Sequence, residues 1–234
     1  MKKLQRKIYN TGFILLFIFI TIIYQVEDKK VSNELKYVAL TYDDGPSIIS
    51  TKKILNLLEK YDASATFFIN GNHANNYKEL VKEIYKNGNE IGNHTLDHGW
   101  LTKMSEEEIR RQIYGNEALL EFLSGQNSDM LVRPPYGDIN QKILDEFDVS
   151  FVMWSVDSRD WEVQDVAVIQ DNVFENIQDG DIIIMHDGYE STVQATKHIL
   201  ERLTKEGFKV VSVTELFNLK NREIPIHEKV YHCK

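Results

Sequence analysis

The sequence contains one cysteine, Cys233, next to its end. A single cysteine cannot form an intramolecular disulfide, so packing alone must stabilise the fold. The sequence also lacks a Gly-x-Gly-x-x-Gly motif and a Walker loop, which leaves nucleotide binding without support. Internal repeats and low-complexity tracts are absent too. With 234 residues and 42% hydrophobic content, the chain can bury one sizeable core, and we expect one catalytic-sized domain.

Acidic residues outnumber basic residues beyond the amino terminus. Residues 1–25 hold four of the 27 basic residues and none of the 36 acidic ones, which leaves a net charge of −13 for the remainder. That balance argues against nucleic acid or a polyanionic surface as the main partner, and a neutral polymer suits it better.

The amino terminus itself combines basic residues with an apolar run. Lys2, Lys3, Arg6 and Lys7 precede an almost wholly apolar segment, 12–24. As a helix, residues 8–26 would rise about 28 Å, close to the hydrocarbon thickness of a bilayer. No small-residue cleavage site follows, so we favour an uncleaved membrane anchor over 1–26, with a cleaved signal and secretion as the alternative. The positive-inside rule then makes the rest of the chain extracytoplasmic.

Strands and helices are expected to alternate after a polar linker, 27–34. The predicted strands are 37–40, 65–69, 90–92, 130–132, 150–154, 181–185 and 209–211, and the predicted helices are 47–60, 77–86, 105–123, 139–147, 163–177 and 192–205. Short apolar strands between amphipathic helices predict an α/β fold with a covered parallel sheet. We expect a distorted seven-stranded (β/α) barrel of the TIM type over 35–219, with an open doubly wound sheet as the alternative. Residues 220–234 would form a polar tail.

Polar clusters follow several of these strands. The first reads Thr-Tyr-Asp-Asp-Gly-Pro-Ser over 41–47 and places Asp43 and Asp44 at a strand's carboxyl end, where α/β folds carry their chemistry. Adjacent carboxylates repel one another and are tolerated best beside a cation. Alone, the stretch is also compatible with an ordinary polar turn and helix cap.

The next cluster is a His-x-x-x-His pair, His94 and His98, after the third strand. Two imidazoles at this spacing can reach one metal ion, although surface histidines reach it by chance as well. Together with a carboxylate from another strand end, they make the two-histidine, one-acid set of open catalytic metal sites.

Three further clusters complete the rim. Arg133-Pro-Pro-Tyr-Gly presents an arginine and a tyrosine on a stiff loop, Asp157 to Trp161 follows the next strand, and His186-Asp187 follows the sixth. Five polar clusters at one edge of one sheet are the distribution expected of an active site.

This set resembles the polysaccharide deacetylases of the NodB-homology type, carbohydrate esterase family 4. The family motifs are Thr-Phe-Asp-Asp-Gly-Pro, His-Ser/Thr-x-x-His, Arg-x-Pro-Tyr-Gly, Asp-x-x-Asp-Trp and Leu-x-His. This sequence departs from them only at Tyr42, which replaces Phe, and at Ile184, which replaces Leu. Order and spacing agree over about residues 37–216.

The resemblance implies a metal ligand set and a general base. Asp44, His94 and His98 would bind a divalent ion, for which we expect Zn²⁺, with Co²⁺ or another divalent ion as the alternative. Such an ion lowers the pKa of bound water and polarises the acetyl carbonyl. Asp43 would be the base that accepts the proton of the water.

The resemblance also assigns the supporting groups. Arg133 would pair with Asp43 and orient it, and the backbone amide of Tyr136 would stabilise the oxyanion. His186 would be the general acid, with Asp160 holding its tautomer and raising its pKa.

Pocket residues follow from the same motifs. Pro135, Trp161 and Ile184 would line the pocket for the acetyl group, while Asp157 is expected to be structural. Outside the motifs, we expect His73 and His198 to be solvated or packed. Residues 227–233 hold two histidines and Cys233 at poor metal-binding spacing, and we expect that segment to fray.

The sequence therefore predicts an anchored, monomeric, metal-dependent N-deacetylase acting on N-acetylglucosamine units of a cell-wall polysaccharide such as peptidoglycan or a chitin-like oligosaccharide. An O-deacetylase acting on acetylated xylan and a catalytically inactive glycan-binding wall protein are the alternatives. A two-metal phosphoesterase lacks the additional acids that it needs.

Overall fold

The computed structural model describes residues 35–126 and 131–234, and residues 36–234 form one unit. The expected anchor over 1–26 lies outside the described residues. Within the described ranges, no helix is both long and apolar enough to cross a membrane.

All eight strands of the described residues take part in parallel pairing. They are β1 (Lys36–Asp43), β2 (Thr66–Ile69), β3 (Glu90–Asn93), β4 (Phe151–Val152), β5 (Val156–Asp157), β6 (Ile182–His186), β7 (Phe208–Val211) and β8 (Lys229–Val230). The main sheet has the order β3-β2-β1-β6-β5, β7 pairs with the first half of β1, and β4 pairs with β8. The predicted parallel α/β sheet is confirmed.

The predicted strand over 130–132 is much shorter in the structure. Of its two described residues, 131 and 132, only Val132 forms bridges, which are isolated parallel ones to Asn93 at the end of β3 and to Phe151 in β4. These bridges connect the main sheet to the β4-β8 pair. The short strands β5 and β8 were not predicted, because two residues carry no readable periodicity.

Side chains alternate across the central strands, and this alternation creates two different faces. On β1, Val38, Leu40 and Tyr42 join the large core beneath the helices, whereas Ala39 belongs to a second core on the opposite face. Thr41 and Asp43 share the face of Ala39 because successive strand residues point to opposite sides. The same alternation places Ile184 and His186 of β6 apart from Ile183 and Met185. The inner face therefore carries the polar groups.

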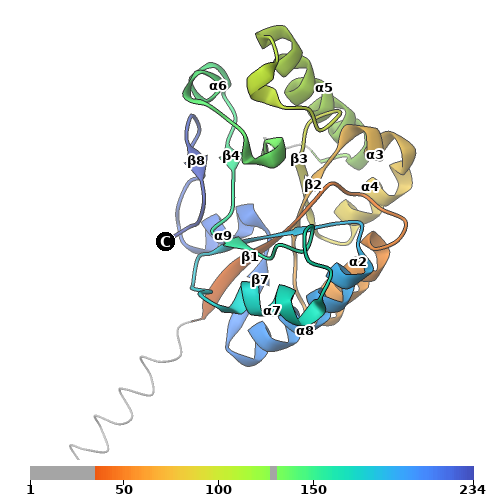
Figure 1. The fold of residues 1–234 in the computed structure, drawn as a ribbon, viewed down its shortest axis with the longest axis vertical. Helices are drawn as coiled ribbons and strands as arrows, with labels where there is room; N and C mark the ends of the chain where they lie inside the picture. The colour runs from red at the N-terminus through yellow and green to blue at the C-terminus, as the bar shows by residue number, and fades with distance from the viewer. Residues whose placement is uncertain (1–34, 127–130) are drawn as a thin grey trace, which may run out of the picture. The chain divides into compact units, whose positions relative to one another are not determined.

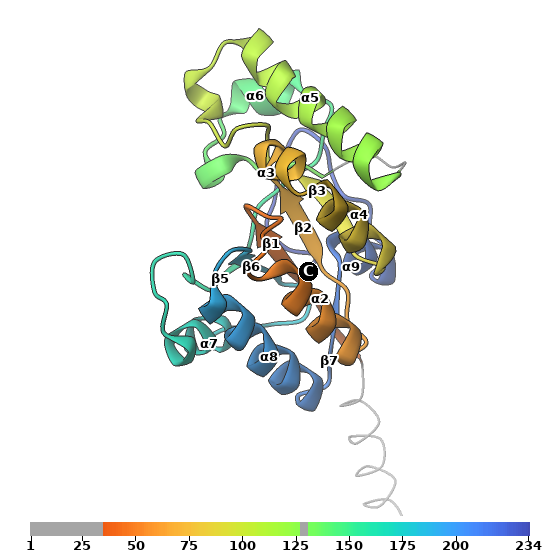
Figure 2. The ribbon, with the colours of Figure 1, turned by 90° about the vertical axis from the view of Figure 1, so that its right-hand side faces the viewer.

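Most helices cover the outer face of the sheet, whereas the last one packs into the inner core. They are α2 (Thr51–Lys60), α3 (Gly71–Asn76), α4 (Lys78–Lys86), α5 (Glu106–Ser124), α6 (Gln141–Glu146), α7 (Val166–Phe174), α8 (Glu190–Lys205) and α9 (Val213–Leu219). Helices α5, α4, α2, α8 and α7 pack in that order around the outer face (Figures 1 and 2). Ser105 and Glu108 form the expected capping box at the start of α5. Helices α3 and α9 were not predicted.

The last residues pack against the domain instead of fraying. Val230 of β8 pairs with Val152, and Cys233 is buried in the inner core. The backbone amide of Cys233 donates a hydrogen bond to the carbonyl of Gly180. Residues 220–234 are therefore part of the packed domain, and the prediction of a frayed polar tail, which rested on composition, was wrong.

Candidate active site

The predicted polar clusters come together at the carboxyl ends of the parallel strands. Asp43 ends β1, His94 follows β3, Arg133 follows the bridge at Val132, and His186 ends β6. Parallel strands point the same way, so residues that follow them meet at one edge of the sheet. The sequence prediction of a shared rim is confirmed.

Backbone strain is concentrated on the same loops. In the described ranges, eight non-glycine residues have positive φ, and five of them lie in the motif loops: Asp44, Thr95, His98, Tyr136 and Arg159. A left-handed backbone is unfavourable for residues with a Cβ and persists where the surroundings hold it. These loops are therefore fixed by their contacts.

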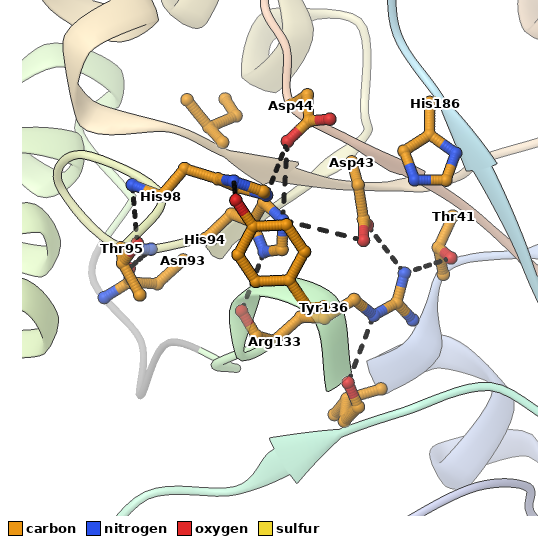
Figure 3. A network of polar contacts seen from close by, with 12 residues as sticks. Thr41, Asp43, Asp44, Asn93, His94, Thr95, His98, Arg133, Tyr136 and His186 are labelled. Carbon is orange, nitrogen blue, oxygen red and sulfur yellow. Dashed lines mark hydrogen bonds and ion pairs between the residues drawn. The ribbon is translucent and has the colours of Figure 1, made fainter. Parts of the chain in front are cut away.

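Asp44, His94 and His98 form a compact set of candidate metal ligands. A carboxylate oxygen of Asp44 lies 3.2 Å from Nε2 of His98 and 3.5 Å from Nε2 of His94. One donor atom from each residue fits within 4.8 Å of the others. Figure 3 shows both imidazoles turned toward Asp44. Two nitrogen donors and one oxygen donor are the set of a catalytic site that keeps a coordination position open.

The two histidines are suited to bind as neutral ligands. Nδ1 of His94 donates to the carbonyl of Arg133 at 2.7 Å, which leaves Nε2 free to face Asp44. Burial and the neighbouring His94 hold the pKa of His98 below its ordinary value. The residues present therefore fit a divalent ion.

Asp43 lies deeper than Asp44 and pairs with Arg133. Nη1 of Arg133 donates to Oδ1 of Asp43 at 2.7 Å, and the side chains are 0% and 4% exposed. Arg133 also donates to Oγ1 of Thr41 and to the carbonyls of Val152 and Met153. Its guanidinium lies 4.0 Å from the ring centroid of Phe68. Burial lowers the pKa of Arg133, and the neighbouring Asp43 opposes that shift.

His186 and Asp160 form a second pair. In Figure 3, His186 lies on the side of Asp43 that faces away from His98. Nδ1 of His186 donates to Oδ1 of Asp160 at 2.8 Å, and the His186 amide and the Thr192 hydroxyl donate to Oδ2. Burial disfavours the imidazolium, but the hydrogen bond to Asp160 and the charge of Asp43 outweigh it. The pKa of His186 is raised to about 9. His186 is therefore protonated at neutral pH.

Asp187 anchors the loop after β1, a role that was not predicted. Its two oxygens accept hydrogen bonds from the hydroxyls of Ser50 and Thr51, both at 2.5 Å. Burial raises the pKa of Asp187 to about 6. A Cβ on Gly45 would stand 2.5 Å from Oδ2 of Asp187, so only glycine fits there without displacement.

A cavity of about 490 Å³ opens over these groups. Trp161 and Ile184 line it, as predicted, together with Asp157. Pro135 is buried in the structure, and Pro134 lies at the cavity wall instead. The lining also includes residues that the sequence reasoning missed: Gly137, Trp154 and Tyr189. Trp154 is the last residue of a predicted strand, and this position at the active-site edge of the sheet could have identified it as a lining residue.

The other histidines divide into one near the site and several remote from it. His73, expected to be solvated or packed, is exposed, yet its Nδ1 donates to the carbonyl of Asp44 at 2.6 Å. His198 is exposed on α8, as expected. His227 contacts Asp148 and the carbonyl of Leu144. Among the described residues, the group with Asp44 is the one set of metal-ligand type.

Comparison with known proteins places this site in a family. The sequence profile described as "Polysaccharide deacetylase" matches residues 30–148. The chain is 36% identical over 196 residues to the peptidoglycan-N-acetylmuramic acid deacetylase PdaC of Bacillus subtilis, covering 84% of this chain and 42% of PdaC. A peptidoglycan-N-acetylglucosamine deacetylase of Bacillus cereus is 38% identical and is covered over 93% of its length, with 82% of this chain.

Solved structures agree. The PdaC structure superposes with a TM-score of 0.77 at 37% identity, over 81% of this chain and 93% of that one. A family 4 acetyl xylan esterase from Clostridium thermocellum, solved with a cobalt ion, superposes with a TM-score of 0.79 at 29% identity. The match covers 84% of this chain and 98% of the esterase. The chain spans about 40% of the length of the first curated relatives that it matches. With five motifs assembled at one rim, the chain belongs to the polysaccharide deacetylase family, the NodB-homology proteins of carbohydrate esterase family 4.

Proposed function

We propose that the protein is a metal-dependent N-deacetylase that removes acetyl groups from N-acetylglucosamine units of a cell-wall polysaccharide. One observation carries the proposal. A metal-ligand set, a buried carboxylate paired with arginine and a protonated histidine paired with aspartate all face one cavity. These are the groups that amide hydrolysis needs: a Lewis acid, a base and an acid.

The metal would be held by Asp44, His94 and His98, and Zn²⁺ is the ion we propose, with Co²⁺ as a substitute. When bound, the ion would supply Lewis-acid polarisation of the acetyl carbonyl and a water of lowered pKa. The mixed nitrogen and oxygen donors suit zinc.

Asp43 is proposed as the general base. Its second oxygen, Oδ2, lies 3.8 Å from Nε2 of His94 and faces the cavity, while Oδ1 is engaged by Arg133. Arg133 would fix the orientation of the carboxylate. Asp43 would therefore accept the proton of the attacking water through Oδ2.

His186 is proposed as the general acid that protonates the departing sugar amine. With a pKa raised to about 9, it holds a proton at neutral pH, and Asp160 keeps that proton arrangement by binding Nδ1. Nε2 is left to donate into the cavity. The backbone amide of Tyr136, in its strained turn, would donate to the oxyanion, and Trp161 and Ile184 would contact the acetyl methyl.

Peptidoglycan is the polymer that we favour, because relatives at 36% and 38% identity carry peptidoglycan deacetylase names. Those names cover both N-acetylmuramic acid and N-acetylglucosamine. A second candidate is an O-acetyl carbohydrate esterase, favoured by the likeness to the acetyl xylan esterase. An ester needs less help from a general acid than an amide, because alkoxide leaves more readily than an amide anion. The raised pKa of His186 supports the amide.

Architecture and location complete the proposal. The pairings β5-β6-β1-β2-β3 continue through the bridges of Val132 to Asn93 and to Phe151 of β4, and residues 153–155 connect β4 to β5 along the chain. This arrangement supports a distorted barrel, open between β4 and β5, with Arg133 buried in it. We also propose that residues 1–26 anchor a monomeric extracytoplasmic domain, as the charge pattern indicates.

Acetate release tests the function. The purified chain should release acetate from peptidoglycan or N-acetylated chitooligosaccharides with added Zn²⁺ or Co²⁺, and a chelator should stop the release. Faster release from acetylxylan than from every N-acetylated substrate would favour the esterase. No release with any substrate and metal would favour a glycan-binding protein without activity.

A further inference from the structure

We propose that the side chain of Tyr136, held in place by Trp100, is a positioning residue for the metal ligand His98. The inference rests on the proposed metal site and concerns the phenol and its support, whereas the proposed function uses only the backbone amide of Tyr136. It adds an outer shell of this chain's own side chains to the ligand set.

The phenol contacts the ring atom of His98 that does not face the other ligands. Nε2 of His98 lies 3.2 Å from the Asp44 carboxylate, and Nδ1 lies 3.2 Å from the hydroxyl of Tyr136. The two rings meet edge to face, with centroids 4.7 Å apart and planes at 70°. Figure 3 shows the hydroxyl of Tyr136 directed at the His98 ring.

The two ligand histidines are supported differently. Nδ1 of His94 is buried and donates to a main-chain carbonyl, that of Arg133, at 2.7 Å. In the described part of the chain, the hydrogen-bond partner of His98 Nδ1 is the Tyr136 hydroxyl, in a more exposed setting. A side-chain substitution can therefore remove the support of His98 but not that of His94.

The chemistry explains what the phenol does. A neutral histidine that binds a metal through Nε2 must carry its hydrogen on Nδ1, so the phenol oxygen accepts that hydrogen. This hydrogen bond fixes the tautomer and the rotation of the His98 ring, and it makes Nε2 a more basic ligand for the metal. Removal of such a partner typically weakens metal binding by about 10- to 100-fold.

Both partners sit in backbone conformations that resist a side chain. φ is +62° at His98 and +61° at Tyr136, in the left-handed region. Glycine would occupy Tyr136 without strain, and the next residue, Gly137, has the same φ sign. A large side chain retained at a glycine-type position is consistent with a contact that compensates the strain.

Trp100 stacks on the Tyr136 ring. The rings stack with centroids 4.1 Å apart and planes at 13°, and Nζ of Lys103 lies 4.4 Å from the Trp100 centroid. Trp100 stands two residues after His98, so a single loop contacts Tyr136 twice. The phenol is therefore limited in where it can move, and its hydroxyl stays opposite Nδ1.

The test is Zn²⁺ affinity of the full chain, measured by competition with a chromophoric chelator. Tyr136→Phe keeps the ring and the backbone amide but removes the acceptor, and we expect a dissociation constant about 10-fold larger. Trp100→Phe should retain the affinity, while Trp100→Ala should weaken it by a few-fold. Tyr231→Phe is the matched control at another exposed tyrosine, and its affinity should be unchanged.

Co²⁺ absorption supplies a second readout. Altered visible bands in Tyr136→Phe, with normal bands in Tyr231→Phe, would support a changed ligand orientation. Equal Zn²⁺ affinity and equal Co²⁺ spectra for Tyr136→Phe and the unsubstituted chain would overturn the inference, and a raised KM alone would assign the aromatic pair to glycan contact. Failure of the unsubstituted chain to bind metal would instead overturn the proposed function.

Discussion

Nη1 of Arg133 lies 2.7 Å from Oδ1 of Asp43, and neither side chain reaches solvent appreciably. The arginine also donates hydrogen bonds to Thr41 and to two adjacent main-chain carbonyls, those of Val152 and Met153, so its position is set by two different segments. A buried ion pair of this kind is costly to break, because the surviving charge stays desolvated. Arg133 thereby links the stability of the fold to the orientation of the proposed base.

Arg133→Met should destabilise the protein by about 3–5 kcal/mol, because it leaves the Asp43 carboxylate and two carbonyls buried without a partner. Urea denaturation measures the change. Lys53→Met is the control, because Lys53 pairs with Glu190 at the surface, where a single ion pair contributes little. Equal midpoints for the two variants would contradict the importance of the buried pair.

Asp43→Asn should separate metal binding from turnover. The amide keeps the size of Asp43 but cannot accept a proton from water, so kcat should fall by about 10²- to 10⁴-fold or more. Asp44, His94 and His98 remain, so bound zinc per chain should stay near that of the unsubstituted protein. His98→Ala should lose both the bound zinc and the turnover. Metal analysis beside acetate release distinguishes them, and full turnover in Asp43→Asn would remove the base assignment.

Asp160→Asn should move the alkaline limit of activity to lower pH. His186 has a pKa raised to about 9, with burial opposing and the hydrogen bond to Asp160 as the main raising contribution. Without that carboxylate, the largest raising contribution is lost while burial still opposes protonation, so the pKa of His186 falls toward the ordinary value of about 6.5.

A general acid works while protonated, so activity is present below its pKa and is lost as pH rises through it. The profile of kcat/KM against pH reports the free enzyme. Thr192→Val is the comparison, because it removes one hydrogen bond to Asp160 and keeps the charge. We expect a smaller shift for it. If the alkaline limit of the kcat/KM profile stays at the same pH in Asp160→Asn, a group other than His186 sets that limit.

The sequence was sufficient to place Asp43, His94 and His186 at one rim, because each lies at or just after the end of an apolar strand. The roles proposed for them followed from the family resemblance. Strand direction then brings residues together that stand as far apart as Asp43 and His186. The parallel sense of the sheet followed from the alternation of strands and helices, whereas the order of the strands was not predicted.

Other features left no readable trace. The strand β8 has two residues, and its pairing with β4 depends on a tail of polar composition. The contact of His73 with the Asp44 carbonyl arises from the unpredicted helix α3. Asp187 is adjacent to His186 in the sequence, yet it accepts hydrogen bonds from Ser50 and from Thr51 at the start of α2. Such contacts depend on tertiary placement, which local patterns do not encode.

Gly45→Ala should show how tightly the loop after β1 is packed. The added Cβ would stand 2.5 Å from Oδ2 of Asp187, far inside contact distance, so the loop or the carboxylate must shift. Overpacking of this kind costs about 1–3 kcal/mol, and a shift of Asp44 should also reduce acetate release.

A double-mutant cycle with Asp187→Ser isolates the cause of that loss. Serine removes the carboxylate that the new Cβ would meet, so Gly45→Ala should cost less free energy of unfolding in the Asp187→Ser background than in the unsubstituted chain. Urea denaturation of the four proteins gives the coupling energy. If Gly45→Ala costs the same in both backgrounds, backbone freedom at residue 45 is the reason for glycine there, and the close approach of Asp187 is not.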